Sequence, residues 1–185
     1  MALLDLFAQN VLIRWIRGDR RRYDLAVAMT GVRLGERVLQ IGCADPGLLA
    51  ALGAKVGYTG RTCGVDPEPG VARSALASVE AAGVLVETTA APYDELGYEA
   101  GSFDLVVVRR LGQLADLAQL GRALKEACRV LRPGGRCIVA GTSGRGAPRD
   151  AGAVVKAALD AGFRGARLLV ERDGWTFVEG LRRGE

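Results

Sequence analysis

A glycine-containing turn, and an acidic residue at the end of the strand that follows it, are the features of this sequence best suited to chemistry. Residues 37–47 read RVLQIGCADPG, an apolar strand that runs into a turn containing Gly42 and Gly47. A second apolar stretch, residues 62–65, ends at Asp66. Glycines let backbone amides approach a ligand closely, and an acid at the end of the next strand can bind both hydroxyls of a ribose. This layout predicts a nucleoside-binding α/β sheet.

Composition narrows the choice of fold and partner. The chain has 185 residues, 49% of them hydrophobic and only 5% aromatic, which is enough for one domain with an aliphatic core. Its 25 basic and 21 acidic residues give a net charge of +4. The basic residues are scattered, apart from Arg20–Arg22, and few aromatics lie among them, so we expect no nucleic-acid partner.

The four cysteines have no metal-binding spacing. They show no Cys-x-x-Cys pair, and the chain contains no histidine, so we expect no metal site. Three of them fall in or beside predicted strands. We interpret them as reduced core thiols of a cytoplasmic protein.

Apolar periodicity predicts alternating helices and strands. Helices are expected at residues 2–17, 22–30, 46–55, 70–82, 114–131 and 151–161, and strands at 38–41, 62–66, 84–88, 102–108, 136–140, 165–171 and 175–181. A Pro-Gly-Gly turn precedes the fifth strand, and Asp173-Gly174 predicts a final antiparallel hairpin. Strands separated by helices imply a doubly wound, mostly parallel α/β sheet. We assign residues 1–32 to an N-terminal helical extension and 33–185 to the α/β domain.

The first predicted helix has an unusually wide apolar face. Leu4, Phe7 and Trp15 lie on one stripe, and arginines follow it. The segment is too short and too often interrupted by polar residues to span a bilayer. Two interpretations stay open: the helix packs on its own domain, or it docks on a partner subunit or a membrane surface, where its arginines meet acidic groups. In the second case the cytoplasmic protein is peripheral to a complex or membrane.

Four segments in order resemble the class I S-adenosylmethionine-dependent methyltransferases, particularly those acting on small molecules. They read VLQIGCADPG, CGVDPEPG, GSFDLVVV and LKEACRVLRPGGRCIVA, and the ending GFRGARLLVERDGWTFVEG resembles the family's last two strands. The resemblance covers residues 33–182. It implies a Rossmann-like seven-stranded sheet, mostly parallel with a C-terminal antiparallel hairpin.

The same resemblance implies S-adenosylmethionine as the cofactor, bound across the carboxyl ends of the strands. Asp66 is expected to accept hydrogen bonds from the ribose; the alternative is that it caps the helix that opens near Pro67. The candidate cofactor-binding residues are Gln40, Gly42, Cys43, Ala44, Gly47, Asp66, Pro67, Pro92, Tyr93 and Arg109.

This sequence departs from the family pattern at the glycine turn. The family usually has an acid where Gln40 stands, and its charge helps to hold the methionine ammonium. Ala44 and Pro46 replace flexible glycines. Asp45 either takes over the acidic role or caps the following helix, and we favour the cap. The loop after the third strand offers no acid until Asp94.

The substrate side carries Arg109 and Arg110 directly after the fourth strand. They could bind an anionic small-molecule substrate, repel a sulfonium, or point into solvent and pair with Glu99 or Asp116. Methyl transfer is an in-line displacement that needs mainly alignment, so no catalytic residue is assigned. The leading hypothesis is a small-molecule methyltransferase. The alternative is a methyltransferase-fold accessory or scaffold subunit that docks through its N-terminal helix.

Overall fold

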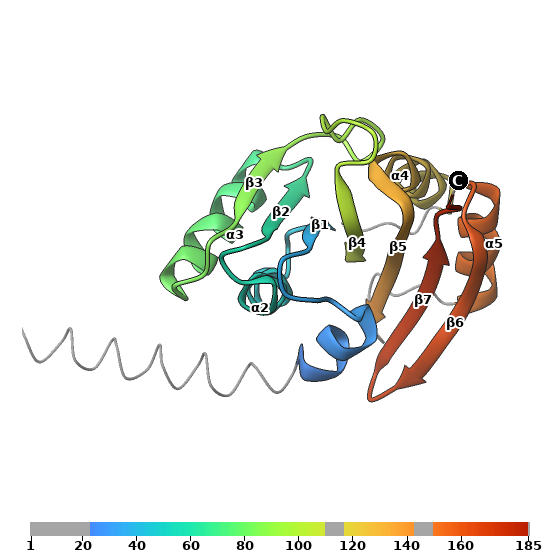
Figure 1. The fold of residues 1–185 in the computed structure, drawn as a ribbon, viewed down its shortest axis with the longest axis horizontal. Helices are drawn as coiled ribbons and strands as arrows, with labels where there is room; N and C mark the ends of the chain where they lie inside the picture. Colours follow the sequence, from blue (N-terminus) through green and yellow to red (C-terminus); the bar gives the residue numbers. More distant parts are fainter. Residues whose placement is uncertain (1–22, 110–116, 143–149, 185) are drawn as a thin grey trace, which may run out of the picture.

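The computed structural model describes residues 23–109, 117–142 and 150–184, which form a seven-stranded sheet flanked by helices (Figure 1). In chain order the strands are β1 (Arg37–Ile41), β2 (Arg61–Asp66), β3 (Glu87–Ala90), β4 (Phe103–Arg109), β5 (Leu131–Thr142), β6 (Arg164–Arg172) and β7 (Trp175–Leu181). The described helices are residues 23–30, α2 (Pro46–Val56), α3 (Pro69–Ala81), α4 (Leu117–Val130) and α5 (Ala151–Asp160). The expected Rossmann-like doubly wound architecture is confirmed.

The strand order is β3-β2-β1-β4-β5-β7-β6, with β3 at one edge of the sheet and the hairpin β6–β7 at the other (Figure 1). Strand β1 pairs in parallel with both β2 and β4, and β7 runs antiparallel between β5 and β6. The chain builds outward from β1 to β3 and then crosses back to β4. Ligands of open α/β sheets bind at the carboxyl ends of the strands beside such a switch point.

Helices cover both faces of the sheet, so the central strands are apolar on both sides. Leu39 of β1 and Val106 of β4 belong to the core cluster that includes α4 and α5. Val38 and Val107, their neighbours in sequence, belong to the cluster that includes α2 and the helix of residues 23–30. Because side chains alternate along a strand, Gln40 and Arg109 extend from the face that carries α2.

Two predicted elements are shifted in the structure. The third strand, expected at 84–88, is β3 at Glu87–Ala90. Val84 and Val86 instead pack toward Gly53 of α2, where an added Cβ would lie 2.7 and 3.2 Å from their methyl groups. Their apolar character therefore reflects contact with a helix rather than strand pairing. Strand β5 starts at Leu131, so it includes the Pro-Gly-Gly segment predicted as a turn before the strand.

The C-terminal hairpin matches its sequence signal. Asp173 and Gly174 both have positive φ, 52° and 74°, as the tight turn of a two-residue hairpin requires. In the described residues no helix is long and apolar enough to cross a membrane.

The predicted helix at 2–17 lies outside the described residues, so its docking role stays a prediction. Of the proposed extension, residues 23–32 are described, and Tyr23, Ala26 and Val32 pack into the cluster beside α2. The boundary at residue 32 also stays a prediction.

Candidate functional site at the carboxyl ends of β1, β2 and β4

A backbone hydrogen bond holds the turn after β1 against β2. The amide of Gly42 donates to the carbonyl oxygen of Val65 at 2.8 Å. Gly42 has a φ of +92°, a conformation that a residue with a Cβ adopts only with strain. This glycine is therefore required by the shape of the turn, and the turn lies beside the end of β2.

Asp66 connects the two turns at this edge. Its Oδ2 accepts a hydrogen bond from the Cys43 amide at 2.9 Å, and its Oδ1 accepts one from the Glu68 amide at 3.1 Å. The side chain is buried, with 4% of its surface exposed. Each carboxylate oxygen has two acceptor positions, so these bonds leave capacity for further donors. Asp66 thus orders the chain just before α3, but it does not cap this helix, whose N-cap residue is Glu68 and which has no side-chain cap bond. The ribose role stays a prediction.

Gln40 presents a buried acceptor at the same edge. Its Nε2 donates to the carbonyl oxygens of Gly42 at 2.9 Å and Asp45 at 3.5 Å. Those two bonds orient the amide, because only the nitrogen can donate to a carbonyl. The Oε1 atom is buried and has no hydrogen-bond partner among the described residues. A buried acceptor without a donor is costly, which suits a position that a ligand donor completes.

Asp45 does not cap α2. It stands at the N-cap position but makes no side-chain cap bond. Its Oδ1 accepts from the Tyr23 hydroxyl, and its Oδ2 lies 2.8 Å from Nη2 of Arg109. Of the three alternatives left open for Arg109, the solvent-facing one is wrong, because only 1% of its side chain is exposed. Glu99, the partner considered for it, is exposed, and Asp116 lies outside the described residues.

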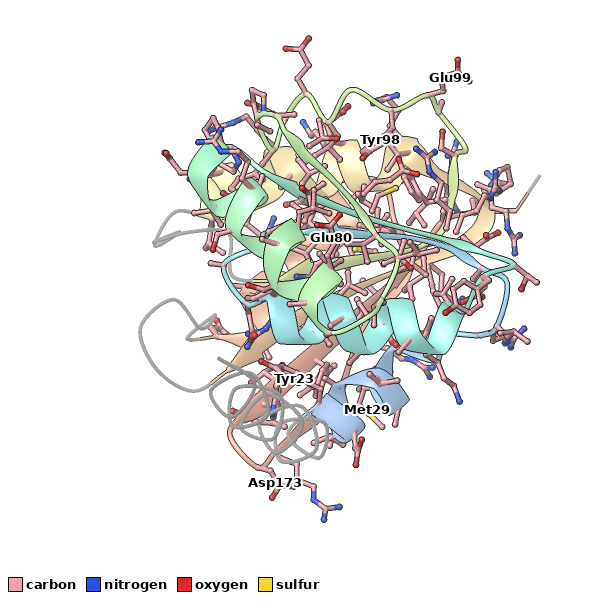
Figure 2. The ribbon with its side chains drawn as sticks, turned by 90° about the vertical axis from the view of Figure 1, so that its left-hand side faces the viewer. Tyr23, Met29, Glu80, Tyr98, Glu99 and Asp173 are labelled. Carbon is pink, nitrogen blue, oxygen red and sulfur yellow. The ribbon has the colours of Figure 1, made fainter. Side chains whose placement is uncertain are left out.

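Arg109 is enclosed by the end of the sheet. Its Nη1 donates to the carbonyl oxygen of Ala140 at 3.3 Å, and its guanidinium carbon lies 4.4 Å from the centroid of the Trp175 ring. Tyr23 meets Trp175 edge-on, with centroids 6.3 Å apart. Figure 2 shows the strands between α4 above and α2 below, with Tyr23 on the α2 side. Arg109 therefore belongs to a buried polar cluster, which we call the Arg109 cluster: Tyr23, Asp45, Arg109 and Trp175.

Gly47 faces a protein side chain. A Cβ at this position would lie 2.5 Å from Cε2 of the Tyr23 ring. The absence of a side chain at Gly47 thus makes room for Tyr23, and the expected role of Gly47 in letting a ligand approach the backbone stays a prediction. This packing brings the Tyr23 hydroxyl to Asp45.

The remaining predicted site residues surround the end of β2. Ala44, Pro67 and Pro92 are exposed, whereas Tyr93 and Cys43 are buried. Burial, and then the charge of the Asp66 carboxylate, raise the pKa of the Tyr93 phenol. The same two causes raise the pKa of the Cys43 thiol to about 12. Both side chains are therefore neutral at physiological pH and can donate a hydrogen bond but cannot act as bases there.

Sequence reasoning missed Tyr23 and Trp175, and it preferred the wrong role for Asp45. One signal was available: an arginine that follows an apolar strand covered on both faces needs a carboxylate partner if it is buried. Tyr98 packs on Phe103 with ring centroids 5.0 Å apart, on the α4 side of the sheet (Figure 2).

Comparison with known proteins is consistent with this architecture. Residues 39–139 match a family model described as a methyltransferase domain. The ribosomal protein L11 methyltransferase of Ralstonia pickettii (strain 12J) is 34% identical over 151 residues, which are 82% of this chain and 45% of that protein. A ubiquinone/menaquinone biosynthesis C-methyltransferase, UbiE, of Hydrogenovibrio crunogenus is 31% identical over 116 residues, 62% of this chain and 45% of that protein. The chain thus spans about half the length of the curated relatives it matches.

A solved structure shares the fold over most of its length. A SAM dependent methyltransferase from Aquifex aeolicus superimposes with a TM-score of 0.72 at 18% identity, covering 85% of this chain and 88% of that one. The strand order, the glycine turn and the matched family model lead to one assignment. The chain belongs to the class I S-adenosylmethionine-dependent methyltransferase family.

Proposed function

We propose that this chain binds S-adenosylmethionine at the carboxyl ends of β1 and β2 and catalyses methyl transfer to a small-molecule acceptor. The observation that carries the proposal is the pair of buried acceptors on either side of the Gly42 turn. These are the Asp66 carboxylate and the Oε1 of Gln40, which has no hydrogen-bond partner in the part of the chain that the structure describes.

The residues present fit the chemistry of this cofactor. Its adenosyl part has two ribose hydroxyls, and its methionine part has an ammonium group; all of these are donors. Asp66 provides charged acceptor positions at the end of β2, and Gln40 provides a neutral acceptor at the end of β1. Hydrogen bonds to charged groups are stronger than those between neutral groups. Because an acid at the end of the second strand of such a sheet binds a ribose, we assign the ribose to Asp66 and the ammonium to Gln40. In each of these two pairings of donor and acceptor, one of the two groups is charged.

The chain's own contribution to the reaction is binding and alignment. When bound, S-adenosylmethionine supplies a methyl group already activated by a positively charged sulfur. The sequence contains no histidine, and the raised pKa values of Cys43 and Tyr93 keep both groups neutral. A general base is needed only when the acceptor arrives protonated. The site thus favours an acceptor atom that is nucleophilic without losing a proton first.

The relatives' names differ: one refers to ribosomal protein L11, the other to ubiquinone and menaquinone biosynthesis. For this chain we keep the small-molecule class, which its sequence motifs suggest. Arg109 does not support an anionic acceptor, because Asp45 already pairs with it at 2.8 Å and only 1% of it is exposed. An anionic substrate would depend on Arg110, which lies outside the described residues.

Isothermal titration with S-adenosylmethionine tests cofactor binding. We expect the wild-type chain to bind, and Gln40→Met to weaken binding about tenfold or more because the buried acceptor is lost. Thr62→Val is a matched control, since Thr62 Oγ1 is also buried without a partner among the described residues but lies near the start of β2. Absence of binding by the wild type would refute the proposal and favour the accessory-subunit alternative.

The acceptor class needs a separate measurement. Cell extract is incubated with the protein and S-adenosylmethionine carrying a radioactive methyl group, and the label is then separated into low-mass and acid-precipitated protein fractions. We expect label in the low-mass fraction. Label confined to protein would contradict the small-molecule assignment while leaving cofactor binding intact.

A further inference from the structure

The Arg109 cluster contains a buried ion pair, Asp45–Arg109, beside the proposed cofactor site. Asp45 belongs to the turn that also contains Gly42, and its carbonyl oxygen lies 3.5 Å from Nε2 of Gln40. Arg109 is the last residue of β4, the strand that pairs with β1. Both side chains are almost fully buried, with 11% and 1% of their surfaces exposed. Their charges are thus poorly screened by water.

The cofactor changes charge during methyl transfer. S-adenosylmethionine has a sulfonium, whereas its product S-adenosylhomocysteine has a neutral thioether, and the two are otherwise alike. An uncompensated positive charge close to the binding site therefore disfavours the first relative to the second. Two unit charges roughly 10 Å apart, at an effective dielectric constant of about 20, interact enough to change an equilibrium constant about tenfold.

We infer that Asp45, by neutralising the buried guanidinium of Arg109, sets the relative affinity of the site for S-adenosylmethionine over S-adenosylhomocysteine. This inference rests on the proposed function. Without Asp45, the Arg109 charge would repel the sulfonium and favour retention of the product. The surrounding side chains keep both charges in place. The Tyr23 hydroxyl donates a hydrogen bond to Oδ1 of Asp45, and the Trp175 ring covers the Arg109 guanidinium.

Three variants test the inference through the ratio of the two dissociation constants. For Asp45→Asn we expect preference for S-adenosylmethionine over S-adenosylhomocysteine to fall about tenfold. For Arg109→Met we expect the preference for S-adenosylmethionine over S-adenosylhomocysteine to rise, because the Asp45 charge then attracts the sulfonium. The double variant removes both charges and should return the ratio close to that of the wild type. Titration calorimetry with each compound gives the constants directly.

Removal of one partner of a buried ion pair can prevent folding. Arg109→Met keeps the test available in that case, because the Tyr23 hydroxyl still donates to Asp45 and the Met side chain can contact Trp175. The double variant leaves no unpaired charge in the cluster. Asp160→Asn is the charge-matched control, since Asp160 is 65% exposed in a surface pair with Lys156, and its ratio should equal that of the wild type.

The possible results distinguish a failure of this inference from a failure of the proposed function. Equal weakening of both compounds by Asp45→Asn and by Arg109→Met would show that the pair is only structural, and would overturn the inference while the proposed function stands. Failure of the wild type to bind either compound would refute the proposed function and the inference with it. Opposite shifts in the single variants, with recovery in the double variant, would support the inference.

Discussion

The contact between Tyr23 and Gly47 allows a sharp test of the site's construction. Gly47 is the second residue of α2, and an added Cβ would lie 2.5, 2.8 and 2.9 Å from Cε2, Oη and Cζ of the Tyr23 ring. Cβ atoms in proteins are essentially never found less than 3.0 Å from a heavy atom of another residue. Gly47→Ala therefore requires the Tyr23 ring to move. Movement of the ring also disturbs its hydroxyl, which donates to Asp45.

The expected loss follows from two opposing contributions. Replacing glycine by alanine in a helix stabilises it by about 0.5–1 kcal/mol. Forcing an extra methyl group into a packed region costs about 1–3 kcal/mol. We therefore expect Gly47→Ala to lower the free energy of unfolding by about 1–2 kcal/mol. Gly70 is the matched control: it also follows a proline at the start of a helix, and no atom of the described residues lies within 4 Å of its Cβ position. Gly70→Ala should stabilise the protein.

Urea denaturation followed by circular dichroism measures both changes. In a Tyr23→Ala background the collision is absent, so Gly47→Ala should there become stabilising, like Gly70→Ala. This double-mutant cycle separates the contact from general helix effects. If Gly47→Ala were as stable as Gly70→Ala in the wild-type background, the Tyr23 ring would not occupy this position, and the Arg109 cluster would lose its support.

Further predictions concern Cys43 and Gln40 in the site and the turn of the C-terminal hairpin. The raised pKa of Cys43, about 12 in the folded protein, should leave it unreactive toward iodoacetamide near pH 8 until the chain unfolds; rapid alkylation of the native Cys43 peptide in mass spectrometry would disprove this. The unfolded thiol ionises near its ordinary pKa of 9.0, so the contribution of Cys43 to stability is complete below about pH 9 and is lost as the pH rises toward 12. Gln40→Glu should destabilise the free protein by about 2–4 kcal/mol, because a carboxylate replaces the amide that donates to two carbonyl groups; an unchanged urea midpoint would contradict it. Gly174→Ala should cost about 1–2 kcal/mol because Gly174 has a φ of +74°, while Asp173→Asn should be nearly neutral; equal thermal midpoints for the two variants would refute the turn assignment.

The sequence alone determined the sheet and the acceptor at the end of β2. Apolar runs separated by helices defined the doubly wound fold, and the position of Asp66 after a strand placed its carboxylate at the carboxyl edge. These are local relationships: a strand, its turn and the next helix are neighbours in sequence, so their arrangement follows from short-range patterns. The main local error, the position of β3, arose because Val84 and Val86 pack on a helix, and apolar character does not distinguish such contact from strand pairing.

Only the tertiary structure decided what Gly47, Asp45 and Arg109 contact. Strand β4 is apolar on both faces, so its sequence does not show which face Arg109 extends from. The partners also lie far apart in the chain: Tyr23 precedes Asp45 by 22 positions, and Asp45 precedes Arg109 by 64. When its tertiary contacts are unknown, an Asp directly before a helix is best interpreted as the N-cap of that helix. In the folded protein a buried guanidinium and a tyrosine hydroxyl compete for the same carboxylate, and the need to compensate a buried charge prevails.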